Sequence, residues 1–118
     1  MNVPIATFEQ FDVVVVPFPF TDRAQSKRRP ALIVSKGAFN YDAGHSVMAM
    51  ITSNTANAWP LDTKISNLKA AGLPSASVVR MKLFTLDHRF VLRKAGRLGK
   101  ADEKIVTKAL IELLPAGF

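Results

Sequence analysis

Segments with the composition of β-strands follow one another closely along this chain. The first lies within residues 12–20 and begins with four consecutive valines, a β-branched residue that suits a packed, pleated surface. Apolar runs at 30–35 and 46–53 follow, with one or two further strands within 76–87. The strands are too close together for crossover helices, so we expect antiparallel neighbours. The sequence predicts a mainly β fold: a small, strongly curved antiparallel barrel of five to seven strands.

A helix is predicted at the C-terminal end. Its apolar positions fall at helical spacing: Ile105, Val106, Ala109, Leu110, Leu113 and Leu114. Asp102 and Glu103 suit the N-terminal end of such a helix, where negative charge is favourable. Before it comes a basic segment, residues 88–100. We expect the helix to attach to the barrel.

Three shorter segments connect the predicted strands. Residues 36–45 carry Gly37, Asn40, Asp42 and Gly44, which is turn chemistry typical of a long connection. Residues 61–66 predict a short strand, and residues 67–74 a single helical turn closed by glycine and proline.

The bulk properties limit what the chain can be. With 118 residues it has room for one core, so we expect a single domain, 1–118. It has no cysteine, which excludes disulfides and thiolate metal sites. The N-terminus lacks the pattern of a signal peptide, and no apolar run approaches the ~20 residues of a membrane span. A cytoplasmic protein with no membrane association is expected.

The charge is strongly positive. Sixteen lysines and arginines against nine acidic residues give a formal charge of +7. Such a field attracts polyanions, of which nucleic acid is the commonest inside cells. An acidic membrane surface or an acidic protein partner fits composition equally well.

Arg29 is the first candidate site residue. It stands where a polar, mobile loop, predicted over residues 21–29, meets the strand that begins at Pro30. Proline restricts the residue before it to extended backbone, so the backbone of Arg29 is fixed and its guanidinium should point in a defined direction. The competing interpretation is that Lys27, Arg28 and Arg29 form a solvated cluster.

Further candidates lie at the end of the third strand and beyond it. Thr52, Ser53 and Asn54 follow an apolar run, where side chains are both positioned and open to ligand, although such residues also form ordinary turns. Trp59 stands in a polar segment and can stack on an unpaired base. Arg80 falls with Lys82 on one alternate face of a strand.

The two histidines are weaker candidates. His45 and His88 could form an acid–base pair, but both stand in segments that predict exposed turns, and we do not expect catalysis by either. No spacing of histidine and acidic residues matches a metal site.

Several segments together resemble the MazF/PemK family of toxins from bacterial toxin–antitoxin systems. They are "FDVVVVPFPFTD", "KRRPALIVS", "MITSN", "GLPSASVV", "TLDHR" and "GRLGKADEKIVTKALIELL", in the family's order across nearly the whole chain. The resemblance implies an SH3-like or CcdB-like barrel that dimerises and cleaves single-stranded RNA without a metal or other cofactor. It also implies a small antitoxin whose flexible, acidic tail lies over the RNA groove. Where the family usually has Gly-Asp before its first strand, this chain has Phe11-Asp12.

The resemblance assigns roles to particular residues. Arg29, before the proline, and Thr52, in Ile-Thr-Ser, correspond to the family's key arginine and threonine, which makes them the predicted catalytic residues. The predicted RNA-binding residues are Gln25, Lys27, Arg28, Ser53, Asn54, Trp59 and Arg80. Metal-free cleavage uses the ribose 2′-OH as nucleophile. Two alternatives stay open: a CcdB-like toxin that binds DNA gyrase without being an enzyme, and an SH3-like RNA-binding module without activity.

Overall fold

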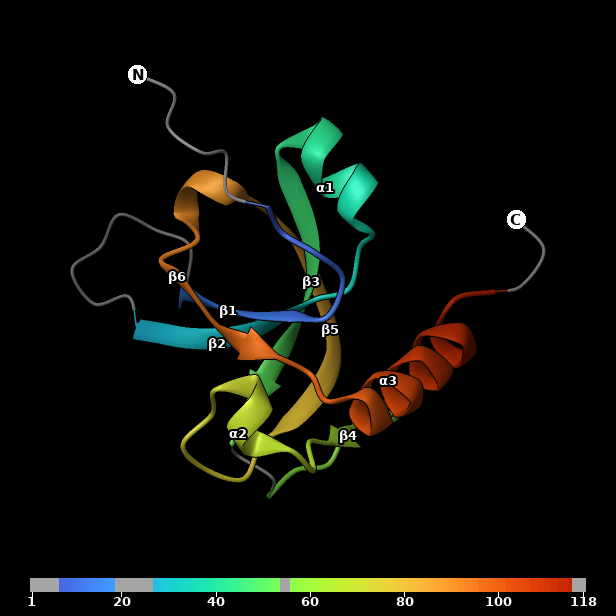
Figure 1. Ribbon diagram of the computed structural model, residues 1–118. Coiled ribbons are helices and arrows are strands. Elements are labelled where there is room, and N and C mark those ends of the chain that lie inside the picture. The colour runs from blue at the N-terminus through green and yellow to red at the C-terminus, as the bar shows by residue number, and fades with distance from the viewer. Residues whose placement is uncertain (1–6, 19–26, 54–55, 116–118) are drawn as a thin grey trace.

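Six strands form one sheet in the computed structural model, which describes residues 7–18, 27–53 and 56–115 (Figure 1). The strands are β1 (Asp12–Phe18), β2 (Lys27–Ile33), β3 (His45–Thr52), β4 (Thr63–Lys64), β5 (Val78–Asp87) and β6 (Arg93–Arg97). Every pairing is antiparallel, and the order across the sheet is β4-β5-β3-β2-β1-β6. The predicted antiparallel, mainly β architecture is therefore confirmed.

The sheet curls into a half-barrel with β4 and β6 at its two edges. Figure 1 shows the long strand β5 curving through the molecule beside β3. Irregularities in pairing occur between Ala49 and Met50 on β3 and between Val13 and Val14 on β1. Such bulges bend a strand and increase its twist, which helps a small sheet to roll up.

Helices lie around the outside of this sheet. They are α1 (Gly37–Ala43), α2 (Leu68–Ala71) and α3 (Lys100–Leu113), with a 3-10 turn, η1 (His88–Phe90). Figure 1 shows α2 beside β6, α3 near β4, and α1 at the opposite end of the molecule from α2. The C-terminal helix and the single turn within 67–74 match their predictions.

Apolar side chains pack on both faces of the sheet. Because strand side chains alternate, neighbours such as Val13 and Val14 enter different clusters. One cluster joins Val13, Leu32 and Ile51 to α2 and α3 through Ala71, Val106 and Ala109. The other, on the opposite face, contains Phe8, Val14, Val16, Ala31, Ile33, Met48 and Leu86. We call these the helix-side face and the Phe8-side face.

A buried carboxylate ties α3 to the chain before α2. Asp102 is only 1% exposed. Its oxygens accept hydrogen bonds from the backbone N–H groups of Ser66 and Asn67 at 3.0–3.1 Å and from Ser66 Oγ at 2.7 Å. Burial raises the pKa of Asp102, but these hydrogen bonds outweigh it and hold the pKa below its ordinary value.

The prediction of a long connection over residues 36–45 is wrong, because α1 forms there. Asn40, which in sequence resembled a turn former, is buried and donates from Nδ2 to the backbone oxygens of Phe8 (2.8 Å) and Ser35 (3.0 Å). Gly44 ends the helix with φ 64°, the left-handed conformation of a C-cap. Contacts with distant residues thus stabilise a helix that the local sequence pattern does not predict.

Two strand boundaries also differ from prediction. Lys27, Arg28 and Arg29 belong to β2 and not to the preceding loop, since they pair with Phe18, Pro17 and Val16 of β1. The basic segment after His88 contributes a strand, β6, that was not predicted. It pairs with β1, more than seventy residues earlier, so no local pattern marks it.

Phe11 occupies the turn position at which the MazF/PemK family usually has glycine. Its φ is 75°, a left-handed conformation that costs an ordinary residue about 1–2 kcal/mol. Its side chain is buried in the helix-side cluster, and burial of an aromatic ring offsets that cost. The tight turn before β1 is therefore retained without glycine.

Candidate functional site

Arg29 is held at the start of β2 on the Phe8-side face. Strand alternation places it on the same face as Ala31 and Ile33, which are buried there, whereas Arg29 itself is exposed. Its partner on β1 is Val16. Pro30 and the ladder with β1 fix the backbone on both sides, so the guanidinium projects from a rigid element.

Thr52 ends the neighbouring strand on the same face. The β2–β3 ladder ends at the pair of Ala31 and Met50, and a continuation of the same register by two residues would set Arg29 opposite Thr52. Directly opposite residues in an antiparallel pair have Cβ atoms about 5 Å apart. Thr52 is half-buried and pairs with Val78 on its other side. The sheet thus carries an arginine and a threonine on one face, near the same end of adjacent strands.

The remaining predicted residues divide between two faces. Lys27 is exposed on the same face as Arg29, and Ser53 is exposed directly after Thr52. Arg28 lies on the helix-side face, because it alternates with Arg29 and lines a hollow together with Pro30. Gln25 and Asn54 lie outside the described residues.

Arg80 reaches the Arg29–Thr52 end from β5, where it pairs with Met50. Its guanidinium donates to both carboxylate oxygens of Asp62, at 3.2 and 2.9 Å, and to the backbone oxygen of Asn57 at 2.9 Å. The bidentate hydrogen bond from Arg80 holds the pKa of Asp62 below its ordinary value. The side chain therefore anchors the segment before β4 rather than standing free.

Trp59 rests on this anchored segment. Its backbone N–H donates to Asp62 at 2.9 Å, and its ring lies 5.7 Å from the guanidinium of Arg80 and 5.6 Å from Nζ of Lys82. The side chain is 42% exposed, as the sequence predicted. An exposed indole with two cations beside it is suited to a base and its phosphates.

The histidines stand at the other end of the sheet. His45 begins β3 and Thr52 ends it, so about 23 Å of strand separates them. The prediction that His88 is exposed is wrong: it is half-buried, its Nε2 shares a 2.6 Å hydrogen bond with Ser46 Oγ, and its ring lies 4.3 Å from that of Phe8. Desolvation lowers the pKa of His88. Neither imidazole reaches Arg29.

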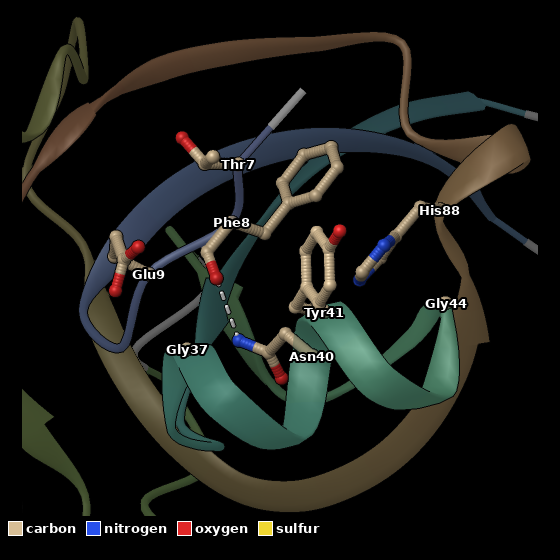
Figure 2. A pocket seen from close by; sticks show the side chains of 8 residues that line it. All are labelled: Thr7, Phe8, Glu9, Gly37, Asn40, Tyr41, Gly44 and His88. Atoms are coloured by element: carbon tan, nitrogen blue, oxygen red, sulfur yellow. Dashed lines mark hydrogen bonds between the residues drawn. The ribbon is translucent and has the colours of Figure 1, made fainter. Parts of the chain in front are cut away.

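A small pocket lies beside His88, and sequence reasoning missed it. Figure 2 shows the rings of Phe8, Tyr41 and His88 around a space of about 160 Å³ above α1, with the Asn40 amide bonded to the Phe8 carbonyl. The sequence had marked Asn40 only as a turn residue and His88 only as a weak catalytic candidate. Because that amide is already satisfied and the described lining contains no lysine or arginine, the pocket offers no fixed positive charge for phosphate chemistry.

Metal ligands do not gather in the described part of the chain. No group of three or more histidine, cysteine or acidic side chains is placed to hold an ion among residues 7–18, 27–53 and 56–115. Within the same residues, no helix is both long and apolar enough to cross a bilayer.

The chain matches a known family over most of its length. The family described as "PemK-like, MazF-like toxin of type II toxin-antitoxin system" matches residues 9–114. No curated protein matches the sequence.

Solved structures of similar fold come from the same toxin group. Form III of MazE–MazF from Deinococcus radiodurans is 22% identical, with a TM-score of 0.73 over 92% of this chain and 96% of that one. Mycobacterium tuberculosis toxin MazF-mt6 is 19% identical, with a TM-score of 0.68 over 84% and 91%. An endoribonuclease in complex with its cognate antitoxin from a mycobacterial species is also 19% identical, with a TM-score of 0.68 over 99% and 100%. At these identities the likeness concerns the fold.

Proposed function

The chain belongs to the family of PemK-like and MazF-like toxins of type II toxin–antitoxin systems, and from this premise we propose that it is a metal-independent endoribonuclease. Its substrate is single-stranded RNA, with mRNA as the cellular target, and cleavage is specific for a short sequence. The whole chain, 1–118, acts as one toxin domain in the cytoplasm and inhibits growth until an antitoxin neutralises it.

One observation carries this proposal: Arg29 and Thr52 lie on the same face of the sheet, near the ends of the neighbouring strands β2 and β3. Within the described residues Arg29 has neither an ion pair nor a side-chain hydrogen bond, whereas Arg80, Arg89 and Arg97 each bond to an aspartate. A guanidinium without a protein partner, beside a hydroxyl and on a rigid strand, is suited to hold a phosphate.

The chemistry needs little more than this pair. The ribose 2′-oxygen gives its proton to water and bonds to the adjacent phosphorus, while the bond from phosphorus to the 5′-oxygen breaks and water supplies the proton that this oxygen needs. The leaving oxygen takes up a proton, so the products carry a 2′,3′-cyclic phosphate and a 5′-OH. Negative charge grows on the nonbridging oxygens, where Arg29 stabilises it with two N–H groups and Thr52 donates one hydrogen bond. Arg29 acts through charge and hydrogen bonding and not as a base, because a guanidinium carries five N–H donors and no acceptor.

Neighbouring residues bind the rest of the strand. Lys27 adds positive charge on the Arg29 side, Ser53 follows Thr52 at the polar end of β3, and Asn54 is the next residue in the sequence. Trp59 stacks on a base, while Arg80 keeps that indole in place through Asp62. Because phosphate contacts dominate such binding, affinity falls steeply with salt.

The chain has two proposed protein partners, an antitoxin and a second copy of itself. The solved neighbours include MazE–MazF complexes, and a chain of charge +7 favours a small antitoxin with an acidic, flexible tail. We propose that the toxin is a homodimer, so that two copies of the Arg29–Thr52 pair serve one assembly.

The test incubates the purified protein with an end-labelled, mixed-sequence single-stranded RNA in EDTA and identifies the fragment ends. Cyclic phosphate and 5′-OH termini support the proposal, and a requirement for magnesium overturns it. Intact RNA together with gyrase-trapped DNA breaks would identify a CcdB-like inhibitor. RNA that is bound but not broken would identify an inactive binding module.

A further inference from the structure

A second cationic site lies on the helix-side face, behind the Arg29–Thr52 pair. It is a hollow of about 210 Å³. The lining residues are Val15, Arg28, Pro30, Gly72, Leu73, Pro74, Arg93 and Ala95. We propose that this hollow binds a short acidic peptide segment that carries one bulky apolar side chain, and that the antitoxin supplies this segment. The identity of the partner rests on the proposed function, whereas the peptide chemistry does not.

Strand register brings the two arginines to the same hollow. Val15 of β1 pairs with Pro30 on one side and with Arg93 on the other, so these three side chains form a row across β2, β1 and β6. Arg28 is two residues from Pro30 and therefore on the same face. One guanidinium thus comes from each strand that flanks β1.

The wall opposite the arginines is rigid. Residues 72–74 follow α2, which is packed so closely on β6 that neither Gly72 nor Gly96 has space for a Cβ atom. An added Cβ would collide with the carbonyl oxygen of Ala95 at Gly72 and with that of Ala70 at Gly96. The hollow is consequently formed before any ligand arrives, which reduces the entropy cost of binding.

Both guanidiniums are available to a ligand. Among the described residues, Arg28 and Arg93 have no side-chain hydrogen bond or ion pair, in contrast to Arg80, Arg89 and Arg97. Two unpaired guanidiniums on one hollow attract an anion strongly, and each can hold a carboxylate through two parallel hydrogen bonds.

The other walls favour a peptide over RNA. Val15, Pro30, Leu73, Pro74 and Ala95 present no side-chain donor or acceptor that can read the edge of a base. A ribose or base placed here would find side-chain hydrogen-bond partners only on Arg28 and Arg93, so the rest of its polar edge would lose hydrogen bonds to water without replacement. A bulky apolar side chain, in contrast, buries against these walls while flanking carboxylates meet Arg28 and Arg93.

The position also matters for inhibition. Because Arg28 and Arg29 alternate along β2, a peptide in this hollow does not occupy the place of the scissile phosphate. The antitoxin would then have a binding site for which RNA does not compete. From there the remainder of its acidic tail could reach the Arg29 face.

The test measures fluorescence anisotropy of the full-length protein with three labelled hexapeptides. The peptide EDLWDE carries acidic residues and an apolar centre, EDSSDE keeps the charge without the apolar centre, and KKLWKK reverses the charge. We expect EDLWDE to bind at least about tenfold more tightly than either other peptide. Arg93→Gln and Arg28→Gln should each weaken it about tenfold. Lys104→Gln, which removes the same charge from an exposed position of α3, should not.

Equal binding of EDLWDE and EDSSDE, or an equal loss in Lys104→Gln, would overturn the proposal, because attraction would then be nonspecific. The proposal would also be overturned if EDLWDE did not bind while a 2′-O-methyl RNA bound the wild type and lost affinity in Arg93→Gln. The hollow would then be an RNA site. The RNA cleavage assay is run separately on the wild type. Selective peptide binding without cleavage supports the hollow and contradicts the nuclease, and cleavage without selective peptide binding does the reverse.

Discussion

Arg28 and Arg29 are adjacent in the chain but lie on opposite faces of β2. Arg29 shares its face with Thr52, whereas Arg28 lines the hollow with Arg93. One cluster of cations in the sequence therefore becomes two separate sites, and substitutions at the two positions should affect different ligands.

We expect Arg29→Ala to abolish RNA cleavage without unfolding the sheet, because the side chain is exposed and contributes charge rather than packing. Arg29→Lys should restore a small fraction of activity, since an ammonium group keeps the charge but not the bidentate geometry. Cleavage rates measure the loss of activity, and thermal unfolding tests whether each variant remains folded. Full activity of Arg29→Ala would remove this arginine from the mechanism.

Replacing the Thr52 hydroxyl should slow cleavage while leaving RNA affinity nearly unchanged. Thr52→Val keeps the shape of the side chain, and the loss of a single transition-state donor costs about 100-fold or more in kcat. Thr52→Ser, the matched control, retains the hydroxyl and most of the activity. Single-turnover rates at saturating protein measure the effect, and equal rates for Val and Ser would mean that the hydroxyl does not take part.

Trp59→Ala should weaken RNA binding by about 1–3 kcal/mol, the usual value of one base stacked on an aromatic ring. Trp59→Phe should recover part of this affinity. The measurement uses labelled RNA and the Arg29→Ala background, so that cleavage does not interfere. If alanine and tryptophan bind equally well, the indole serves only to pack against Arg80 and Lys82.

Two helix-capping glycines should differ sharply when each is replaced by alanine. Both have positive φ, 64° at Gly44 and 71° at Gly72, but among the described residues no atom beyond the chain neighbours lies within 4 Å of a Cβ added at Gly44. Gly44→Ala should therefore cost about 1 kcal/mol from backbone strain alone. Gly72→Ala, whose Cβ meets the Ala95 carbonyl, should cost about 2–5 kcal/mol. Urea denaturation gives both values, and equal costs would contradict the close packing of α2 on β6.

Acid should destabilise the fold through His88. Burial lowers the pKa of this imidazole, with Asp87 raising it and His45 lowering it to smaller extents. In the window between its lowered folded value and the ordinary value of 6.5, the unfolded chain binds the proton more readily. The free energy of unfolding should therefore be highest above pH 6.5 and fall as the pH decreases through this window. His88→Gln should reduce that fall, whereas His45→Gln should change it little. An unchanged pH profile in His88→Gln would contradict the assignment.

Much of the architecture follows from short-range patterns. Buried apolar side chains give these elements a local pattern that the sequence shows directly. Such patterns are the valine run of β1, the apolar run of β3 and the helical spacing of α3. The Arg-Pro and Ile-Thr-Ser segments also mark Arg29 and Thr52 as candidates, since each stands where an apolar strand meets polar residues, but it is the family resemblance that makes them a pair.

Long-range contacts decided the rest. Hydrogen bonds from Asn40 to Phe8 and Ser35 favour a helix where the sequence resembled a loop, and β6 exists because it pairs with β1. Burial of Phe11 permits a backbone conformation that ordinarily favours glycine. Which arginine faces which ligand depends on strand register, because a side chain's face is set by its pairing partners. Local composition reports that a cation is present, but only the folded sheet determines where it points.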